Sequence, residues 1–192
     1  WSSRNPGPAS VTRHRTIETS DVLKQHVPLL AHAASQVGDP QVRHRGTIGG
    51  SLAHADPSGE MTAVLALLGG TVTLASRGSE RTVGAADFFR GPLESAVRPG
   101  EVAVEAFFPA PGDRSGSAWA EVSRRHGDYA VCGVAALVTL DEDLRITAAG
   151  VGLISVGPTP AVVDLSAALA GQPYDAADVR AAGALVRGAV DP

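Results

Sequence analysis

Residues 46–51 combine three glycines and two hydroxyl side chains around one isoleucine, in the order Gly46, Thr47, Ile48, Gly49, Gly50 and Ser51. Glycine has no Cβ and accepts positive φ, so consecutive backbone N–H groups can turn toward one anion. We expect this turn to lead into a helix over Pro57–Leu68, with Asp56 as the N-cap. A glycine turn before a helix N-terminus is a common phosphate site. The alternative is an ordinary tight turn, because the pattern is neither GxGxxG nor a P-loop.

The basic cluster Arg43-His44-Arg45 lies directly before the glycine turn. Its charge suits a bound phosphate or an acidic partner chain. The alternative is a solvated loop that approaches the turn. We expect no metal site, because no second His or Cys stands at ligand spacing from His54 and the chain has one cysteine.

Length and composition narrow the class of protein. The chain has 192 residues, of which 44% are hydrophobic and 19% charged, so it is long enough for one large or two small globular domains. Its net charge of −4 gives no general attraction to nucleic acid or anionic lipid, and we expect neither as a partner. The longest nearly uncharged apolar run, Tyr129–Leu140, is too short for the roughly 20 residues of a transmembrane helix. Because we find one cysteine and no secretory signal, we expect the cytoplasm as the compartment.

The N-terminal part of the chain shows helix signals followed by strand signals. Residues 1–10 are expected to form a loose tail. The alternation over Val11–Ile17 predicts an edge strand, and Pro28 to Gly38 has the spacing and the closing glycine of an amphipathic helix. Further along we expect a hairpin of Thr71–Ala75 and Arg81–Val83, a helical turn over Ala85–Phe89 and a strand over Val102–Phe108.

Pro, Gly and Ser cluster over residues 109–117, between two strand-like segments, and this composition predicts a domain junction. We therefore divide the chain into domains 11–112 and 113–192. The second domain is expected to hold three antiparallel strands followed by two helices, which is an α+β pattern. The strands are Ala118–Ser123, Val131–Leu140 and Arg145–Ile154, and the helices are Ala161–Ala170 and Ala176–Val190, the last opened by Asp175.

Five separated motifs follow one another along the chain. They are RHRGTIGGSLAHADP at 43–57, ADFFRGP at 86–92, RPGE at 98–101, RRHGDYA at 124–130 and VGPTP at 156–160. In this order they resemble the FAD-binding, or medium, subunits of the molybdenum hydroxylases. The carbon monoxide dehydrogenase flavoproteins look most similar and the xanthine dehydrogenase flavin domains more distant. The resemblance runs from about Thr12 to the last residue.

The resemblance implies a partial PCMH-type FAD-binding domain, followed by a small C-terminal domain of the carbon monoxide dehydrogenase flavoprotein type. FAD is then the cofactor, and no residue of the chain is catalytic, because the flavin carries the redox chemistry. Residues 46–51 correspond to the second of two glycine-rich loops that bind the pyrophosphate in the family. Asp56 and Glu60 lie in the stretch that reaches the ribityl and nearby hydroxyls. Asp128 and Tyr129 match a turn that approaches the isoalloxazine.

Each of these assignments has a plainer structural alternative. Asp56 is also a suitable N-cap, and Glu60 is also an ordinary acid in the first turn of a helix. His54 is either a hydrogen-bonding partner of the flavin or of the loop, or a loop histidine without such a role. Tyr129 either stacks on the flavin or anchors the start of a core strand.

The resemblance implies an electron-transfer component of a molybdenum hydroxylase, which passes electrons from the iron–sulfur clusters of a partner chain through FAD to an acceptor. The implied partners are an iron–sulfur subunit and a molybdopterin-binding large subunit. The first glycine-rich loop of the family, of the Gly-Gly-x-Ser type, has no counterpart in residues 1–45. We therefore expect a chain truncated at both ends, with weakened FAD affinity of its own. The alternative function is a cofactor-free fragment or docking module that retains the subunit interface.

Overall fold

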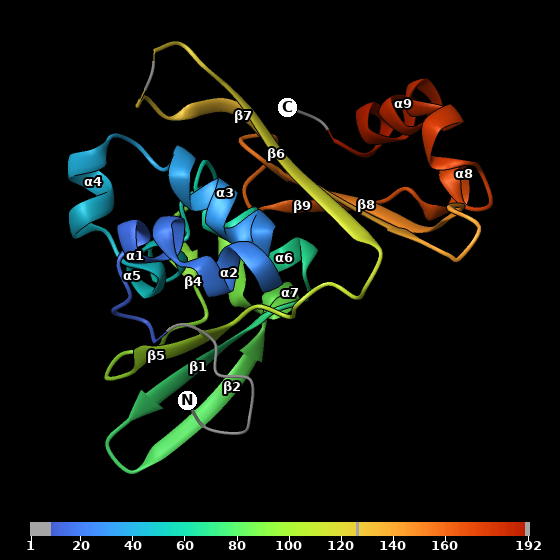
Figure 1. The fold of residues 1–192 in the computed structure, drawn as a ribbon. Coiled ribbons are helices and arrows are strands. Elements are labelled where there is room, and N and C mark those ends of the chain that lie inside the picture. Colours follow the sequence, from blue (N-terminus) through green and yellow to red (C-terminus); the bar gives the residue numbers. More distant parts are fainter. Residues whose placement is uncertain (1–8, 126, 191–192) are drawn as a thin grey trace.

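The computed structural model describes residues 9–125 and 127–190 and has two parts (Figure 1). The expected tail at 1–10 lies outside the described residues except for Ala9 and Ser10, which contact the strand formed by residues 102–107. The first part begins with six short helices. They are α1 (His14–Thr19), α2 (Asp21–His26), α3 (Pro28–Gln36), α4 (Pro40–Arg45), α5 (Ile48–His54) and α6 (Glu60–Leu67).

The predicted helix after Pro28 is confirmed as α3. Pro28 occupies its first turn, where the missing N–H costs nothing, and Gly38 follows its end with φ of +50°. By contrast, the predicted edge strand over Val11–Ile17 is wrong, because α1 begins at His14. His14 and Ile17 stand three residues apart and are both buried, so the spacing of a helix decides this segment. Arg13 retains one isolated bridge, to Thr47.

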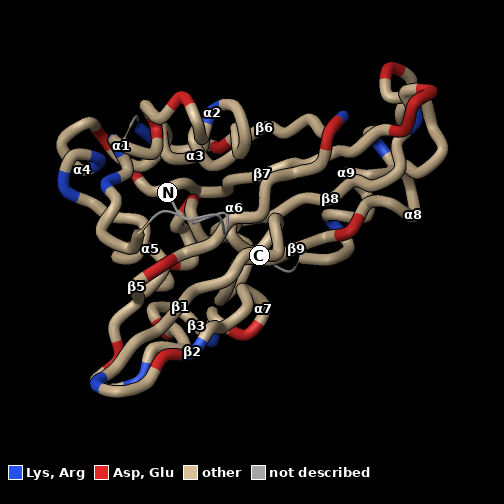
Figure 2. The backbone as a smooth tube through the Cα atoms, turned by 60° about the horizontal axis from the view of Figure 1, so that its bottom comes forward, with Lys and Arg blue, Asp and Glu red and all other residues tan. Residues whose placement is uncertain are grey.

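A three-stranded antiparallel sheet follows the helices, with strand order β2-β1-β5. Its strands are β1 (Thr71–Ser76), β2 (Ser79–Gly84) and β5 (Val102–Phe107). The predicted hairpin, helical turn and final strand are thus confirmed, with the turn as α7 (Ala85–Phe88). A small ribbon of β3 (Phe89–Gly91) and β4 (Glu94–Ser95) completes this part. In Figure 2 charged residues gather along the β1–β2 hairpin and on α4.

The second part is a four-stranded antiparallel sheet with strand order β6-β7-β8-β9. The three predicted strands are confirmed as β6 (Ser115–Ser123), β7 (Ala130–Leu140) and β8 (Ile146–Ile154). A helix was expected from Ala161, but Ala161–Asp164 forms β9, which pairs with β8, and only α8 (Ser166–Leu169) is helical. The last helix is α9 (Val179–Ala189), and its N-cap is Asp178 rather than Asp175. Helices combined with antiparallel sheets confirm the α+β class.

One hydrophobic core joins the two parts, because helix α6 lies against β7 and β8. Gly152 permits this approach, since a Cβ there would lie 2.8 Å from the carbonyl oxygen of Ala63 and 3.1 Å from Cβ of Leu67. The core contains residues from both parts, among them Ile48, Leu52, Met61, Trp119, Ala135 and Ile154. Within the described ranges, none of the helices has the length and apolar character that crossing a membrane requires.

Candidate functional site

A cavity of about 250 Å³ lies where the segment from α5 to α6 faces the turn before β7. It brings together six of the residues that the sequence assigned to the cofactor: Ser51, His54, Asp56, Glu60, Asp128 and Tyr129. The rest of the lining comes from Val37, Gly38, Val42, Ser58, Gly59 and Gly127. Residues more than 70 positions apart in the sequence therefore share one site.

The glycine stretch differs from the turn that we expected. Thr47 is the N-cap of α5, and Gly49 and Gly50 lie in the first turn of that helix, while Gly46 has an ordinary φ of −63°. No positive φ is needed at these three positions. The helix forms in spite of its two glycines because Thr47 Oγ1 accepts a hydrogen bond of 3.1 Å from the Gly50 N–H.

Several backbone donors of this turn are already paired within the chain. The Ile48 N–H donates to Thr12 O at 3.0 Å and the Gly49 N–H to Ser10 O at 2.8 Å. The Ser51 N–H donates to Thr47 O at 3.0 Å. The N–H groups of Ile48, Gly49 and Ser51 are therefore engaged within the chain in this arrangement, and residues 46–50 are not among those that line the cavity.

The glycines allow close packing instead. A Cβ on Gly49 would lie 2.8 Å from Ser10 O, and a Cβ on Gly46 would lie 2.8 Å from Cδ2 of His14. Both distances are shorter than an ordinary contact, so larger residues would displace the segment formed by residues 10–14. The glycines thus hold the start of α5 against the N-terminal segment.

His14 is a site residue that the sequence did not suggest. Its side chain is 1% exposed, and its Nε2 lies 2.8 Å from the hydroxyl oxygen of Ser51. Burial, reinforced by the nearby charge of Arg43, lowers the pKa of His14 from 6.5 to about 4, so the ring is neutral at pH 7. No sequence signal identifies it, because it lies in the segment that reads as an edge strand.

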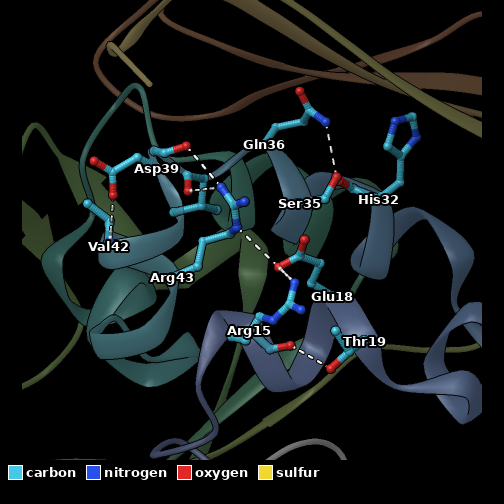
Figure 3. A network of polar contacts seen from close by, with 11 residues as sticks. Arg15, Glu18, Thr19, His32, Ser35, Gln36, Asp39, Val42 and Arg43 are labelled. Carbon is cyan, nitrogen blue, oxygen red and sulfur yellow. Dashed lines mark hydrogen bonds and ion pairs between the residues drawn. The ribbon is translucent and has the colours of Figure 1, made fainter. Parts of the chain in front are cut away.

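Arg43 belongs to the expected basic cluster, but it is buried and structural (Figure 3). Its Nε donates to Glu18 of α1 at 3.1 Å, and its Nη1 donates to the carbonyl oxygens of Val37 and Gly38 at 3.2 and 3.0 Å. Val37 and Gly38 form one wall of the cavity. The guanidinium therefore fixes this wall to α1, whereas His44 and Arg45 are exposed.

The expected N-cap role of Asp56 is wrong, because α6 begins at Glu60 and its N-cap is Gly59. Asp56 instead accepts a hydrogen bond from the Ser58 N–H at 2.8 Å, which shapes the turn between the helices. Its other carboxylate oxygen lies 3.8 Å from Nε2 of His54, the last residue of α5. The Asp56 carboxylate thus remains at the cavity as an acceptor.

Glu60 opens α6 and lines the same cavity. Burial, opposed by a backbone hydrogen bond and aided by the carboxylates of Glu121 and Asp56, raises its pKa from 4.5 to about 7. Near pH 7 this side chain therefore exists in both protonation states. As an acid it donates a hydrogen bond, and as a carboxylate it accepts.

Asp128 and Tyr129 form the opposite wall of the cavity, in the turn before β7. Tyr129 is 71% exposed, so it does not anchor a core strand. Asp128 Oδ1 accepts a hydrogen bond from the Tyr129 N–H at 3.2 Å, and its Oδ2 lies 3.6 Å from Nη2 of Arg124. The aromatic ring is thereby presented at the mouth of the cavity, where it is free to stack on a ligand.

The residues at the cavity fit one part of FAD. Carboxylate acceptors suit sugar or ribityl hydroxyls, the Ser51 hydroxyl suits an oxygen, and the Tyr129 ring suits a planar heterocycle. A volume of about 250 Å³ is below the roughly 300–1,000 Å³ that is usual for a complete small-molecule site. Among the described residues, no group of three His, Cys, Asp or Glu is arranged to hold a metal ion.

Comparisons with known proteins agree with this cofactor. Residues 9–111 match the family described as the FAD binding domain in molybdopterin dehydrogenase. Residues 117–192 match the CO dehydrogenase flavoprotein C-terminal domain.

Two curated relatives illustrate the family. The 6-hydroxypseudooxynicotine dehydrogenase complex subunit alpha of Paenarthrobacter nicotinovorans is 42% identical over 150 residues, which is 78% of this chain and 51% of the relative. The carbon monoxide dehydrogenase medium chain of Afipia carboxidovorans is 34% identical over 152 residues, 79% of this chain and 52% of the relative. The chain thus spans about half the length of these relatives.

Solved structures give the same result. A carbon monoxide dehydrogenase structure from Hydrogenophaga pseudoflava has a TM-score of 0.86 at 31% identity, covering 95% of this chain and 64% of that one. Quinoline 2-oxidoreductase from Pseudomonas putida 86 has a TM-score of 0.88 at 32% identity, with the same coverage. The chain therefore belongs to the family of FAD-binding subunits of the molybdopterin dehydrogenases.

Proposed function

We propose that this chain is the FAD-binding, electron-transfer portion of a molybdenum-containing hydroxylase or dehydrogenase. The observation that carries the proposal is the convergence of Ser51, Asp56, Glu60 and Tyr129 on one cavity, in a chain of this family. FAD, when bound, supplies an acceptor for electrons and a donor to a further acceptor. The proposed partners are an iron–sulfur subunit and a molybdopterin-binding large subunit, and the proposed compartment is the cytoplasm.

The proposed roles of the residues follow from their chemistry. Asp56 holds a hydroxyl-bearing part of the ligand through its carboxylate, and Asp128 fixes the turn that carries Tyr129. Tyr129 covers a planar ring and excludes water from one of its faces. Glu60 forms a hydrogen bond with the ligand. It donates as the neutral acid and accepts as the carboxylate. Residues 46–50 support the site by holding α5 in place, and His54 lies at its rim beside Asp56.

A titration of the 192-residue chain with FAD, followed by flavin fluorescence, tests this function. We expect saturable 1:1 binding. On a desalting column, we expect flavin to elute with the protein, whereas free FAD is retained. Asp56→Ala and Tyr129→Ala should each weaken binding about tenfold, corresponding to about 1.4 kcal/mol. Asp143→Ala, in the exposed turn between β7 and β8, is the matched control and should bind as the unaltered chain does. Equal affinities of all variants would contradict the assigned site.

The second candidate function is a cofactor-free docking module. It is favoured by the paired N–H groups of Ile48 and Gly49 and by the small volume of the cavity. Co-expression with the iron–sulfur and large subunits of a related dehydrogenase distinguishes the two functions. A complex that contains this chain and no flavin supports the docking module, whereas a yellow complex with one FAD per chain supports the flavoprotein.

A further inference from the structure

Ser51 lies between the cavity and a buried histidine. Ser51 lines the cavity, and its Oγ lies 2.8 Å from Nε2 of His14. His14 is 1% exposed, and its second ring nitrogen, Nδ1, is buried without a hydrogen-bond partner among the described residues. We propose that His14 is a positioning residue: its neutral ring donates Nε2–H to Ser51 Oγ, so the hydrogen of Ser51 is free to donate into the cavity. The proposal rests on the function assigned above to this cavity.

The unpartnered Nδ1 selects the tautomer. A hydrogen on Nδ1 would be a buried donor without an acceptor, and the hydrogen of Ser51 would then be needed by the bare Nε2. A hydrogen on Nε2 leaves only a bare acceptor at Nδ1 and satisfies the contact to Ser51. Orphaned buried N–H groups are rarer in proteins than under-satisfied acceptors, so we assign the Nε2–H tautomer.

The surroundings of His14 keep the ring neutral and in place. Arg43 lies close enough to oppose protonation, and its own contacts to Glu18 and Gly38 hold it there. Gly46 leaves room for the imidazole, because a Cβ at that position would lie 2.8 Å from Cδ2 of His14. The His14 N–H also donates to Gly46 O at 3.1 Å, which fixes the backbone behind the ring.

A hydroxyl that is available as a donor adds a function that the carboxylates of Asp56 and Asp128 lack. Asp56 and Asp128 offer acceptors, whereas an oxygen atom of the ligand, such as a phosphate or carbonyl oxygen, needs a donor. With a bare Nε2, the Ser51 hydrogen would point toward His14 instead of into the cavity. With the Nε2–H of His14 in place, Ser51 presents a donor before the ligand arrives, and the cost of ordering it on binding falls.

The tautomer is measured without any ligand. We expect nitrogen-15 NMR of the histidine-labelled 192-residue chain at pH 7 to show a neutral ring with protonated Nε2 and bare Nδ1. The ring is assigned by the signals that disappear in His14→Gln. A protonated Nδ1 or an imidazolium at this position overturns the proposal. This measurement does not depend on FAD binding. If the chain fails to bind flavin, the proposed function is contradicted, while the tautomer of His14 is still decided by the NMR result.

Substitutions test the effect on the ligand. Ser51→Ala and His14→Leu should each raise the dissociation constant for FAD about tenfold, and the double variant should be no weaker than either single one. His14→Gln places an amide N–H near the position of Nε2 and should stay within about threefold of the unaltered chain. His32→Leu, on the exposed surface of α3, is the control. If His14→Gln is as weak as His14→Leu, or His14→Leu binds normally, His14 does not act through Ser51.

Discussion

The hydroxyl oxygens of Ser155 and Ser58 lie 2.8 Å apart, although the two residues are 97 positions apart in the sequence. Ser58 lines the cavity, and Ser155 directly follows β8, so this contact ties the second part of the chain to the site. The Ser155 hydroxyl also donates to Ala130 O at 2.7 Å, and its N–H donates to Pro57 O at 2.9 Å. The site therefore depends on the contacts that Ser155 makes between the two parts.

The first prediction concerns the hydrogen bonds of Ser155. Ser155→Ala removes both hydroxyl contacts and should lower the free energy of unfolding by roughly 1–3 kcal/mol, since each hydrogen bond contributes about 0.5–1.5 kcal/mol. Ser117→Ala is the matched control, because the Ser117 hydroxyl is buried without a partner among the described residues. Its removal should leave stability unchanged or increased. Urea denaturation of both variants is the measurement, and equal midpoints would contradict the role of Ser155.

The second prediction concerns the packing of the glycines. Gly49→Ala should destabilise the fold by roughly 1–3 kcal/mol, because its Cβ would overlap the backbone of Ser10. Gly188→Ala in α9 meets nothing within 4 Å and should be neutral, or stabilising by up to about 1 kcal/mol. Thermal unfolding of the two variants checks this. A normal melting temperature for Gly49→Ala would show that the approach of Ser10 is not required.

The third prediction concerns Arg43. Arg43→Met leaves the carbonyl oxygens of Val37 and Gly38 without their donor. It also leaves the Glu18 carboxylate with only its pair to the exposed Arg15, at 3.1 Å, so stability should fall by about 3 kcal/mol. The control removes an exposed cation: Arg114→Met breaks a surface pair with Glu142 and should cost less than about 1 kcal/mol. Denaturant unfolding compares the two. Similar small losses would mean that Arg43 is not structural.

The fourth prediction concerns pH. The pKa of Glu60 is raised from 4.5 to about 7, so its contribution to stability is full below pH 4.5 and is lost as the pH rises through 7. The pKa of His14 is lowered from 6.5 to about 4, so its contribution is full above pH 6.5 and is lost as the pH falls through 4. Between about pH 4.5 and 6.5, the Glu60 contribution to the free energy of unfolding falls with pH and the His14 contribution rises. In the unaltered chain these two changes oppose each other.

Removing one group should expose the slope of the other. Stability of Glu60→Gln should rise with pH across this window, and stability of His14→Gln should fall, each by up to about 1.4 kcal/mol per pH unit. Urea midpoints at pH 4.5, 5.5, 6.5 and 7.5 give the slopes. Glu101, whose pKa is lowered to about 2 mainly by its hydrogen bond with Arg81, titrates below the window. Parallel profiles for the two variants would refute the assignment.

Local signals in the sequence predicted much of the fold. Pro28 and Gly38 delimit α3, and the turn at Gly78 joins two alternating segments into a hairpin. Helix α5 was missed because two glycines disfavour a helix, and the contacts that stabilise its start come from Ser10 and Thr12, which are distant in the sequence. Strand β9 was missed because its pairing with β8 overrides the local pattern of small residues.

The site was predictable in part. Motifs of the family identified Asp56, Glu60 and Tyr129, and the structure places all three at one cavity. The expected role of Gly49 in binding the pyrophosphate came from the glycine pattern and the family resemblance, neither of which reveals that Ser10 accepts its N–H in this structure. His14 could not be found, because a single histidine in a misassigned segment carries no signal until burial and the contact to Ser51 are known.

We propose that FAD binds at the cavity between the segment from α5 to α6 and the turn before β7. Mapping amide chemical-shift changes on adding FAD to the nitrogen-15-labelled 192-residue chain tests it most directly. We expect saturable shifts for residues 51–60 and 127–129, and none for the tip of the β1–β2 hairpin around Gly78. Absence of shifts at saturating FAD, or shifts confined to other surfaces, would contradict it.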